Sequence, residues 1–253
     1  MKKYEYYKDL LTELTKKEIK VRYKNSYLGY LWSLANPLLL ALIFYFVFKV
    51  VTKVQMKDYT LFLISGLFVW QWISNTIIGS ANLYISNASL IKKVNFPRNF
   101  LAISLTLSEG FNFLMSIPVI LFFMLYYHKL PTIYWSWIPV LMILTGFFIY
   151  SISLLIATIN LFFRDMERLI GLLMTLMFYL TPIIYPMSMV PMKYHTLLYL
   201  NPFVPIVLLW QDILIYNKFS FESLGLSLIY AVIAFIVSFF TYNKLKYKFA
   251  ELV

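Results

Sequence analysis

The sequence predicts an all-α membrane protein with six transmembrane helices, an N-terminal amphipathic interface helix and re-entrant outer gate helices between spans five and six. Of the 253 residues, 61% are hydrophobic and only 13% are charged. Several apolar runs reach the roughly 18 residues that a membrane helix needs. The formal net charge of +11 falls between those runs, so we interpret it as a signal for topology and anionic lipid and not for nucleic acid.

Residues 1–30 are predicted to form an amphipathic interface helix at a cytoplasmic N-terminus. Tyr4, Tyr7, Leu11 and Leu14 recur at helical spacing, and basic residues fill the other faces, as in helices that lie in the membrane interface. Lys16, Lys20, Arg22 and Lys24 lie on or just after this helix, beside the first span. An ordinary solvated helix is the alternative, which we disfavour because the first span follows directly.

Residues 31–253 are predicted to form one six-span domain. The predicted spans cover residues 31–48, 60–82, 99–127, 137–163, 169–185 and 224–242. Six spans place both termini on one side of the membrane. The segments on that side hold 16 of the 22 Lys and Arg residues, so the positive-inside rule makes both termini cytoplasmic.

The second and third predicted spans contain polar side chains. In the second span, Gln71 and Asn75 share one helix face, which indicates either close helix packing or a wet path. In the third span, Glu109 lies deep in the apolar run. A carboxylate in lipid costs several kcal/mol, so Glu109 has to face protein or water. A polar lining and a structural hydrogen bond are equally good explanations.

The segment 182–217, between spans five and six, is rich in proline. Its apolar run Phe203–Trp210 is too short to cross a bilayer, and its prolines are Pro182, Pro186, Pro191, Pro202 and Pro205. This pattern predicts one or two re-entrant helices that cover the outer side of the protein. A partly buried outer loop is the alternative.

The cytoplasmic loop 86–100 combines positive charge with a small apolar face. Its basic residues are Lys92, Lys93 and Arg98, and its apolar residues are Leu90, Ile91, Val94 and Phe96. Pro97 ends any helix at this point. The pattern predicts a short amphipathic helix that docks on lipid or on a partner protein. A plain lipid-facing turn is the alternative.

The sequence shows no catalytic or nucleotide-binding motif. None of the seven glycines opens a Walker A loop, and no GxSxG motif is present. His128 and His195 belong to no metal motif, and the absence of cysteine excludes disulfides and thiolate sites. We expect no catalytic residue, no metal and no cofactor in this chain, so a transport step would draw its energy from another protein.

Five stretches, together with the amphipathic N-terminal helix, resemble ABC-2-type transporter permeases. They are YKNSYLGYLWSLANPLL at 23–39, NFPRNF at 95–100, FRD at 163–165, YLTPIIYP at 179–186 and LNPFVPIV at 200–207. More narrowly, the chain is similar to the polysaccharide-export branch, the Wzm-type O-antigen subunit and its teichoic-acid counterpart. Each motif alone is loose, whereas their order and spacing are fairly specific and cover nearly the whole chain.

The resemblance implies a homodimer in the inner (cytoplasmic) membrane, paired with two copies of a separate ATP-binding subunit that holds ATP and Mg²⁺. It also implies export of a polysaccharide linked to a polyprenyl diphosphate. Two alternatives stay open. One is export of a drug or another lipid by the same fold. The other is a membrane-embedded enzyme acting on a lipid-linked sugar.

The resemblance also suggests roles for individual residues. ATPase coupling is expected of Leu90, Ile91, Lys92, Lys93, Val94, Asn95, Phe96, Pro97 and Arg98, with Phe96 as a buried anchor in the partner. The lipid diphosphate is expected to enter beside Lys16, Lys20, Arg22 and Lys24. The channel is expected to be lined by Tyr45, Phe62, Trp70, Gln71, Trp72, Asn75, Glu109, Phe178, Tyr179 and Tyr185, because sugar C–H faces stack on aromatic rings.

Overall fold

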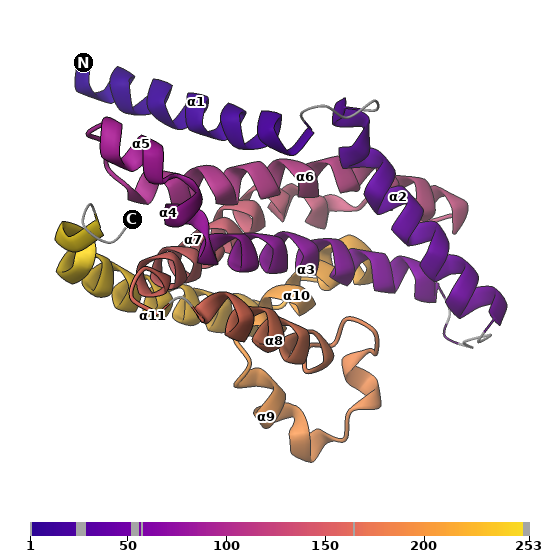
Figure 1. Ribbon diagram of the computed structural model, residues 1–253. Coiled ribbons are helices and arrows are strands. Elements are labelled where there is room, and N and C mark those ends of the chain that lie inside the picture. The colour runs from indigo at the N-terminus through magenta and orange to yellow at the C-terminus, as the bar shows by residue number, and fades with distance from the viewer. Residues whose placement is uncertain (1, 24–28, 52–55, 57, 164, 250–253) are drawn as a thin grey trace.

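The computed structural model describes residues 2–23, 29–51, 56, 58–163 and 165–249. Every regular element in these ranges is a helix (Figure 1). The long helices are α1 (Lys2–Tyr23), α2 (Trp32–Tyr45), α3 (Tyr59–Ala81), α6 (Asn99–Tyr126), α7 (Ile138–Asn160), α8 (Met166–Tyr179) and α11 (Phe221–Leu245). The shorter ones are η1 (Gly29–Leu31), η2 (Phe46–Val51), α4 (Leu83–Ser86), α5 (Ala88–Lys93), η3 (Ile133–Trp137), η4 (Met187–Met189), η5 (Met192–Tyr194), α9 (His195–Tyr199), α10 (Phe203–Gln211), η6 (Asp212–Tyr216) and η7 (Lys246–Lys248).

The described residues contain four helical segments that are long and apolar enough to cross a membrane. They are Tyr59–Ala81, Asn99–Tyr126, Ile133–Asn160 and Phe221–Lys248, which coincide with the predicted spans two, three, four and six. A fifth candidate is the bent pair described below. The apolar helix Trp32–Phe48 is shorter, and α8 has 14 residues. The chain is therefore a multi-pass membrane protein with four to five candidate spans among its described residues, and the count of six stays a prediction.

The proline-rich segment bends sharply between two helical pieces. The helical path bends by 111° between Met192–Tyr199 and Phe203–Tyr216. At the bend, the Asn201 side-chain oxygen accepts a hydrogen bond from the Phe203 N–H at 3.0 Å. Helix α10 is buried along almost its whole length, which provides protein cover for a helix too short to span the bilayer. This geometry is compatible with a re-entrant pair, whose role as an outer gate stays a prediction.

Helix α3 forms the centre of the bundle. Every residue from Tyr59 to Trp70 is buried, because α6, α7, α8 and α10 all pack on this helix. Helix α11 is the least buried of the four candidate spans. Only 17% of its apolar stretch is buried, and it packs mainly on α7. An apolar helix with so much exposed surface suits contact with lipid.

A second, smaller apolar cluster lies at the end of the bundle where both termini are found (Figure 1). It joins Leu14 of α1 to Tyr84, Phe96 and Phe249. The rings of Phe249 and Tyr84 are 4.9 Å apart. The N-terminal helix, the loop 86–100 and the C-terminal segment therefore pack together as one unit.

Candidate functional site: a polar cavity between α1, α2, α3 and α6

A cavity of about 620 Å³ opens between the C-terminal end of α1 and helices α2, α3 and α6. This volume lies within the range of roughly 300–1,000 Å³ that ligand sites occupy. Amide, hydroxyl and aromatic side chains share its wall. The lining residues are Arg22, Trp32, Ser33, Asn36, Pro37, Leu40, Phe68, Gln71, Trp72, Asn75, Glu109, Asn112, Phe113 and Ser116.

An ion pair between α1 and α6 lies in this wall. Arg22 Nη1 donates to Glu109 Oε2 at 2.8 Å, and Arg22 Nη2 donates to Glu109 Oε1. The Glu109 side chain is 1% exposed, whereas that of Arg22 is 38% exposed. Asn112 Nδ2 adds a further hydrogen bond to Glu109 Oε2 at 3.3 Å. A two-pronged Arg–carboxylate pair is among the stronger polar contacts in proteins, and here it satisfies a carboxylate that would be costly to bury alone.

Helix α1 lies alongside α6 (Figure 1), which brings these two residues together. Near the start of both helices, the rings of Tyr7 and Phe100 lie 5.4 Å apart. Further along α6, Arg22 meets Glu109, and Glu109 and Asn112 face the same way because residues three apart share a helix face. Glu109 is therefore both part of a polar lining and a structural partner, the two explanations that the sequence left open.

Trp72 separates the polar cavity from an apolar groove behind it. Its Nε1 donates to the Thr106 backbone oxygen at 3.1 Å, and its ring stacks on Phe113 at 5.4 Å. The groove, about 520 Å³ between α6 and α7, has Trp72, Gly110 and Gly146 in its wall. A Cβ on Gly110 would lie 3.2 Å from Trp72 Cζ2, so glycine permits this close approach.

The cavity brings together part of the channel lining predicted from the sequence, namely Gln71, Trp72, Asn75 and Glu109. The other predicted aromatic residues lie outside its wall. Phe62 and Trp70 are buried in the core, and the Trp70 ring packs on Phe178 at 5.9 Å.

The three remaining tyrosines contact their own neighbourhoods. The Tyr45 and Tyr126 hydroxyls are hydrogen-bonded at 3.2 Å. The Tyr185 hydroxyl donates to the Tyr179 backbone oxygen at 3.1 Å. Their expected place along a channel stays a prediction, because a channel shared by two subunits would not be visible in one chain.

Residues 9–215 match the family model described as ABC-2 type transporter. The chain belongs to the ABC-2 transporter family. Two proteins of Klebsiella pneumoniae, each named O-antigen export system permease protein RfbA, are 44% and 45% identical to it over 249 residues, which is 98% of this chain and 96% of each relative. A protein of the same name from Myxococcus xanthus is 32% identical over 209 residues, 82% of this chain and 80% of the relative. The family that the motifs suggested is thereby confirmed.

In this ABC-2 chain, the loop predicted for ATPase coupling is partly buried by the chain itself. Ile91 and Phe96 are 5% and 7% exposed and belong to the cluster with Leu14 and Phe249. The expectation that the Phe96 ring anchors a partner is therefore corrected, since that ring is already covered within the chain. The residues that the loop does expose are Lys92, Lys93, Val94 and Asn95, while Leu90, Pro97 and Arg98 are half-buried.

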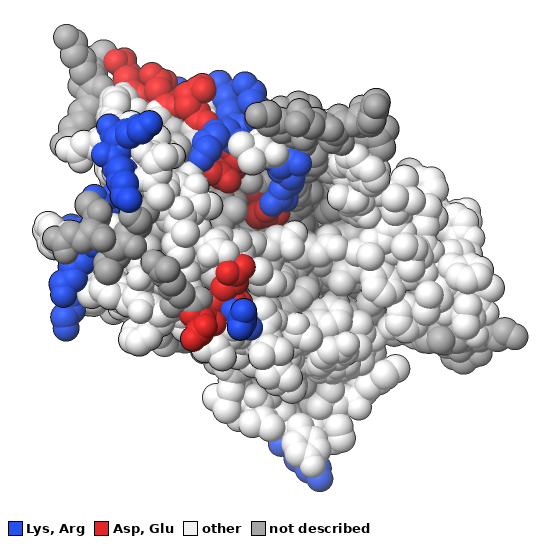
Figure 2. All heavy atoms as spheres, viewed as in Figure 1, with Lys and Arg blue, Asp and Glu red and all other residues white. Residues whose placement is uncertain are grey.

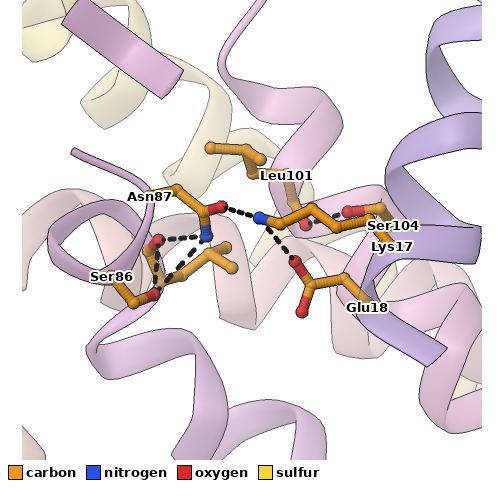
Figure 3. A network of polar contacts seen from close by, with 7 residues as sticks. Lys17, Glu18, Ser86, Asn87, Leu101 and Ser104 are labelled. Atoms are coloured by element: carbon orange, nitrogen blue, oxygen red, sulfur yellow. Dashed lines mark hydrogen bonds and ion pairs between the residues drawn. The ribbon is translucent and has the colours of Figure 1, made fainter. Parts of the chain in front are cut away.

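Helix α1 is tied to this loop through Lys17 (Figure 3). The Lys17 ammonium donates to Asn87 Oδ1 and lies 3.6 Å from a Glu18 carboxylate oxygen. Asn87 in turn donates to the Leu83 backbone oxygen at 2.9 Å. Lys17 of α1 thus contacts the loop 86–100, and Arg22, at the C-terminal end of the same helix, contacts the cavity.

The basic residues predicted for the lipid diphosphate do not form one cluster. Lys16 Nζ lies 2.8 Å from Glu13, and this hydrogen bond lowers the pKa of Glu13. Lys20 is exposed, Arg22 is paired with Glu109, and Lys24 lies outside the described residues. Figure 2 shows acidic and basic side chains interleaved over α1, while much of the remaining face is uncharged.

These acidic partners were not predicted from the sequence, for two different reasons. Glu13 and Lys16 are three residues apart, so helix geometry could have paired them. Arg22 and Glu109 are 87 residues apart, and no local pattern connects them.

Among the described residues, no group of three or more His, Cys, Asp and Glu side chains could hold a metal ion.

Proposed function

We propose that this chain is the membrane permease subunit of an ATP-driven exporter that moves a polyprenyl-diphosphate-linked polysaccharide of the O-antigen type across the cytoplasmic membrane. The observation that carries the proposal is the polar cavity, which has the Arg22–Glu109 pair in its wall. The chain that forms this cavity is similar over 98% of its length to an O-antigen export permease. Polar and ionisable groups inside membrane helices are costly and mark solute pathways. Close helix packing alone would not require a cavity of about 620 Å³.

The proposed assembly is a homodimer with two copies of a separate ATP-binding subunit. The missing Walker A motif supports an external source of ATP hydrolysis. The surface offered to that subunit is the exposed part of the loop 86–100, namely Lys92, Lys93, Val94 and Asn95. A movement imposed there would pass through the Lys17–Asn87 contact into α1 and from α1 to the cavity wall.

The proposed topology has six spans with both termini in the cytoplasm. Helix α2 and the following η2 together cover the 20 residues from Trp32 to Val51, about the length needed to cross a bilayer. Helix α8 would complete its crossing with the residues that follow it. Both termini lie at the same end of the bundle (Figure 1), as an even number of spans requires.

The topology can be tested with single cysteines, because the chain has none of its own. Cysteines at Lys92 and Lys193 should be labelled from opposite sides of sealed vesicles by an impermeant maleimide. Labelling of both positions from the same side would contradict the six-span topology.

The function can be tested in a Klebsiella pneumoniae strain that lacks its own RfbA. The chain, expressed with its cognate ATP-binding subunit, should restore O-antigen at the cell surface, as measured by immunoblot of the lipopolysaccharide. A partner with an inactivated ATPase site is the control and should not restore it. Stable expression in the membrane without any surface polysaccharide would count against the proposed function.

A further inference from the structure

The charge of the polar cavity is balanced within its own wall. Arg22 and Glu109 are the charged side chains among its described lining residues, and they are bound to each other through both carboxylate oxygens. The other polar side chains of the wall carry no charge; they are Ser33, Asn36, Gln71, Asn75, Asn112 and Ser116.

This balance argues against a diphosphate as the ligand of the cavity. An anionic group would meet a neutral pair, because the charge of Arg22 is already balanced by Glu109. To bind through the N–H groups that hold Glu109, it would have to draw Arg22 away from that carboxylate. Glu109 is 1% exposed, so it would then lie buried without a counterion, which is strongly unfavourable. The sequence-based expectation that Arg22 binds the lipid diphosphate is therefore one that this geometry disfavours.

We propose that the cavity binds an uncharged sugar ring of the exported glycan, and that the Arg22–Glu109 pair excludes anionic groups from it. This inference rests on the proposed function and names the chemistry that the same site recognises. Amide side chains offer both donors and acceptors, which suits a ring of hydroxyl groups. Gln71 and Asn75 are at least partly exposed, and neither side chain has a hydrogen-bond partner among the described residues, so both are available to a ligand.

The aromatic part of the wall suits the same ligand. Trp32 is partly exposed and offers an aromatic surface to the C–H face of a sugar. Trp72 is 4% exposed and is held by Thr106 and Phe113, so it forms a rigid wall. A pre-positioned wall reduces the ordering cost of binding.

The first test measures binding to the purified full-length chain in nanodiscs. The probes are D-galactose, D-mannose, L-rhamnose and inorganic pyrophosphate, at about 150 mM salt to screen the exposed charges of α1. Saturation-transfer NMR should detect at least one sugar, and equilibrium dialysis should detect no pyrophosphate at the cavity. A folded wild-type chain that binds none of the sugars, or that binds pyrophosphate in competition with a sugar, would overturn the proposal.

Two α3 variants locate the binding. The double substitution Gln71→Leu/Asn75→Leu should weaken sugar binding by about tenfold or more, since tenfold corresponds to roughly one lost hydrogen bond. Asn82→Leu is the matched control, because Asn82 follows on the same face of α3 but is not in the cavity wall. Equal sugar affinity in the double variant and the wild type would overturn the proposal.

Two charge variants test the role of the ion pair. Glu109→Gln frees the Arg22 guanidinium, so pyrophosphate binding should rise by about tenfold or more. Arg22→Gln/Glu109→Gln removes both charges and should bind pyrophosphate no better than the wild type. No gain of pyrophosphate binding in folded Glu109→Gln would overturn the exclusion of anions. If that variant does not fold, the binding of sugars and pyrophosphate to the wild type, and of sugars to the α3 variants, still tests the proposal.

The cell assay keeps the two proposals apart. Export of O-antigen by a chain whose cavity binds no sugar would overturn this inference and leave the proposed function standing. Sugar binding at Gln71 and Asn75 without export would support this inference and count against the proposed function.

Discussion

The contact between Arg22 and Glu109 should couple helix α1 to the membrane bundle energetically. Removal of either partner leaves the other charge in a site built for a pair. Breaking a buried ion pair costs about 3–5 kcal/mol. Because the Arg22 side chain is 38% exposed, water can enter the space that Arg22→Met opens and reach Glu109, so we expect the lower end, about 3 kcal/mol, for this variant.

The double substitution should cost far less than the sum of the two single ones. Arg22→Met/Glu109→Met replaces both charges with flexible apolar side chains, and a buried pair exchanged for packed apolar residues is often nearly neutral. The expected coupling energy in the double-mutant cycle is about 2–3 kcal/mol, at the upper end of what contacting residues show.

The measurement is thermal unfolding of the four proteins in one detergent, followed by size-exclusion chromatography of the heated samples. For a chain of this size, about 1 kcal/mol shifts the melting temperature by roughly 2–4 °C, so Arg22→Met should melt about 6–12 °C lower than the wild type. The double variant should recover most of that loss. Additive effects, or single variants that melt like the wild type, would refute the reasoning.

Two further predictions concern packing. Phe96→Ala should destabilise the isolated permease by about 3 kcal/mol, the cost of truncating a buried aromatic ring, whereas the exposed Val94→Ala should change its melting temperature little; a Phe96→Ala variant that loses only partner binding would restore the anchor role corrected above. Gly110→Ala places a Cβ 3.2 Å from the Trp72 ring and should destabilise by about 1 kcal/mol, since overpacking exceeds the gain in helix propensity. Gly225→Ala meets no atom within 4 Å and should be neutral or stabilising, so equal melting temperatures of these two glycine variants would contradict the packing described.

The helices that match the predictions best are those with the clearest apolar runs. The ends of α3 and α6 lie within one residue of the predicted spans, because length and apolar composition alone define such helices. The bend near Pro202 could also be predicted from the local sequence, because proline interrupts a helix.

The features that the sequence left undetermined depend on contacts between distant segments. The apolar face that contains Phe96 could equally have been covered by a partner or by the chain's own α1 and C-terminal segment. Likewise, Glu109 needed a partner, but the identity of that partner depends on how α1 lies along α6, which no periodicity reveals. The polar stripe with Gln71 and Asn75 indicated packing or a wet path, and only the position of α2 and α6 shows the cavity in front of it.

The most direct test of the account is ATP-driven movement of a lipid-linked glycan by the purified complex. The permease and its ATP-binding subunit would be reconstituted into liposomes with the O-antigen lipid in the membrane, and a lectin outside would report glycan that reaches the outer leaflet. We expect lectin binding to rise only when ATP, permease and an active ATP-binding subunit are all present. ATP hydrolysis by the assembled complex without any glycan reaching the lectin would contradict the account.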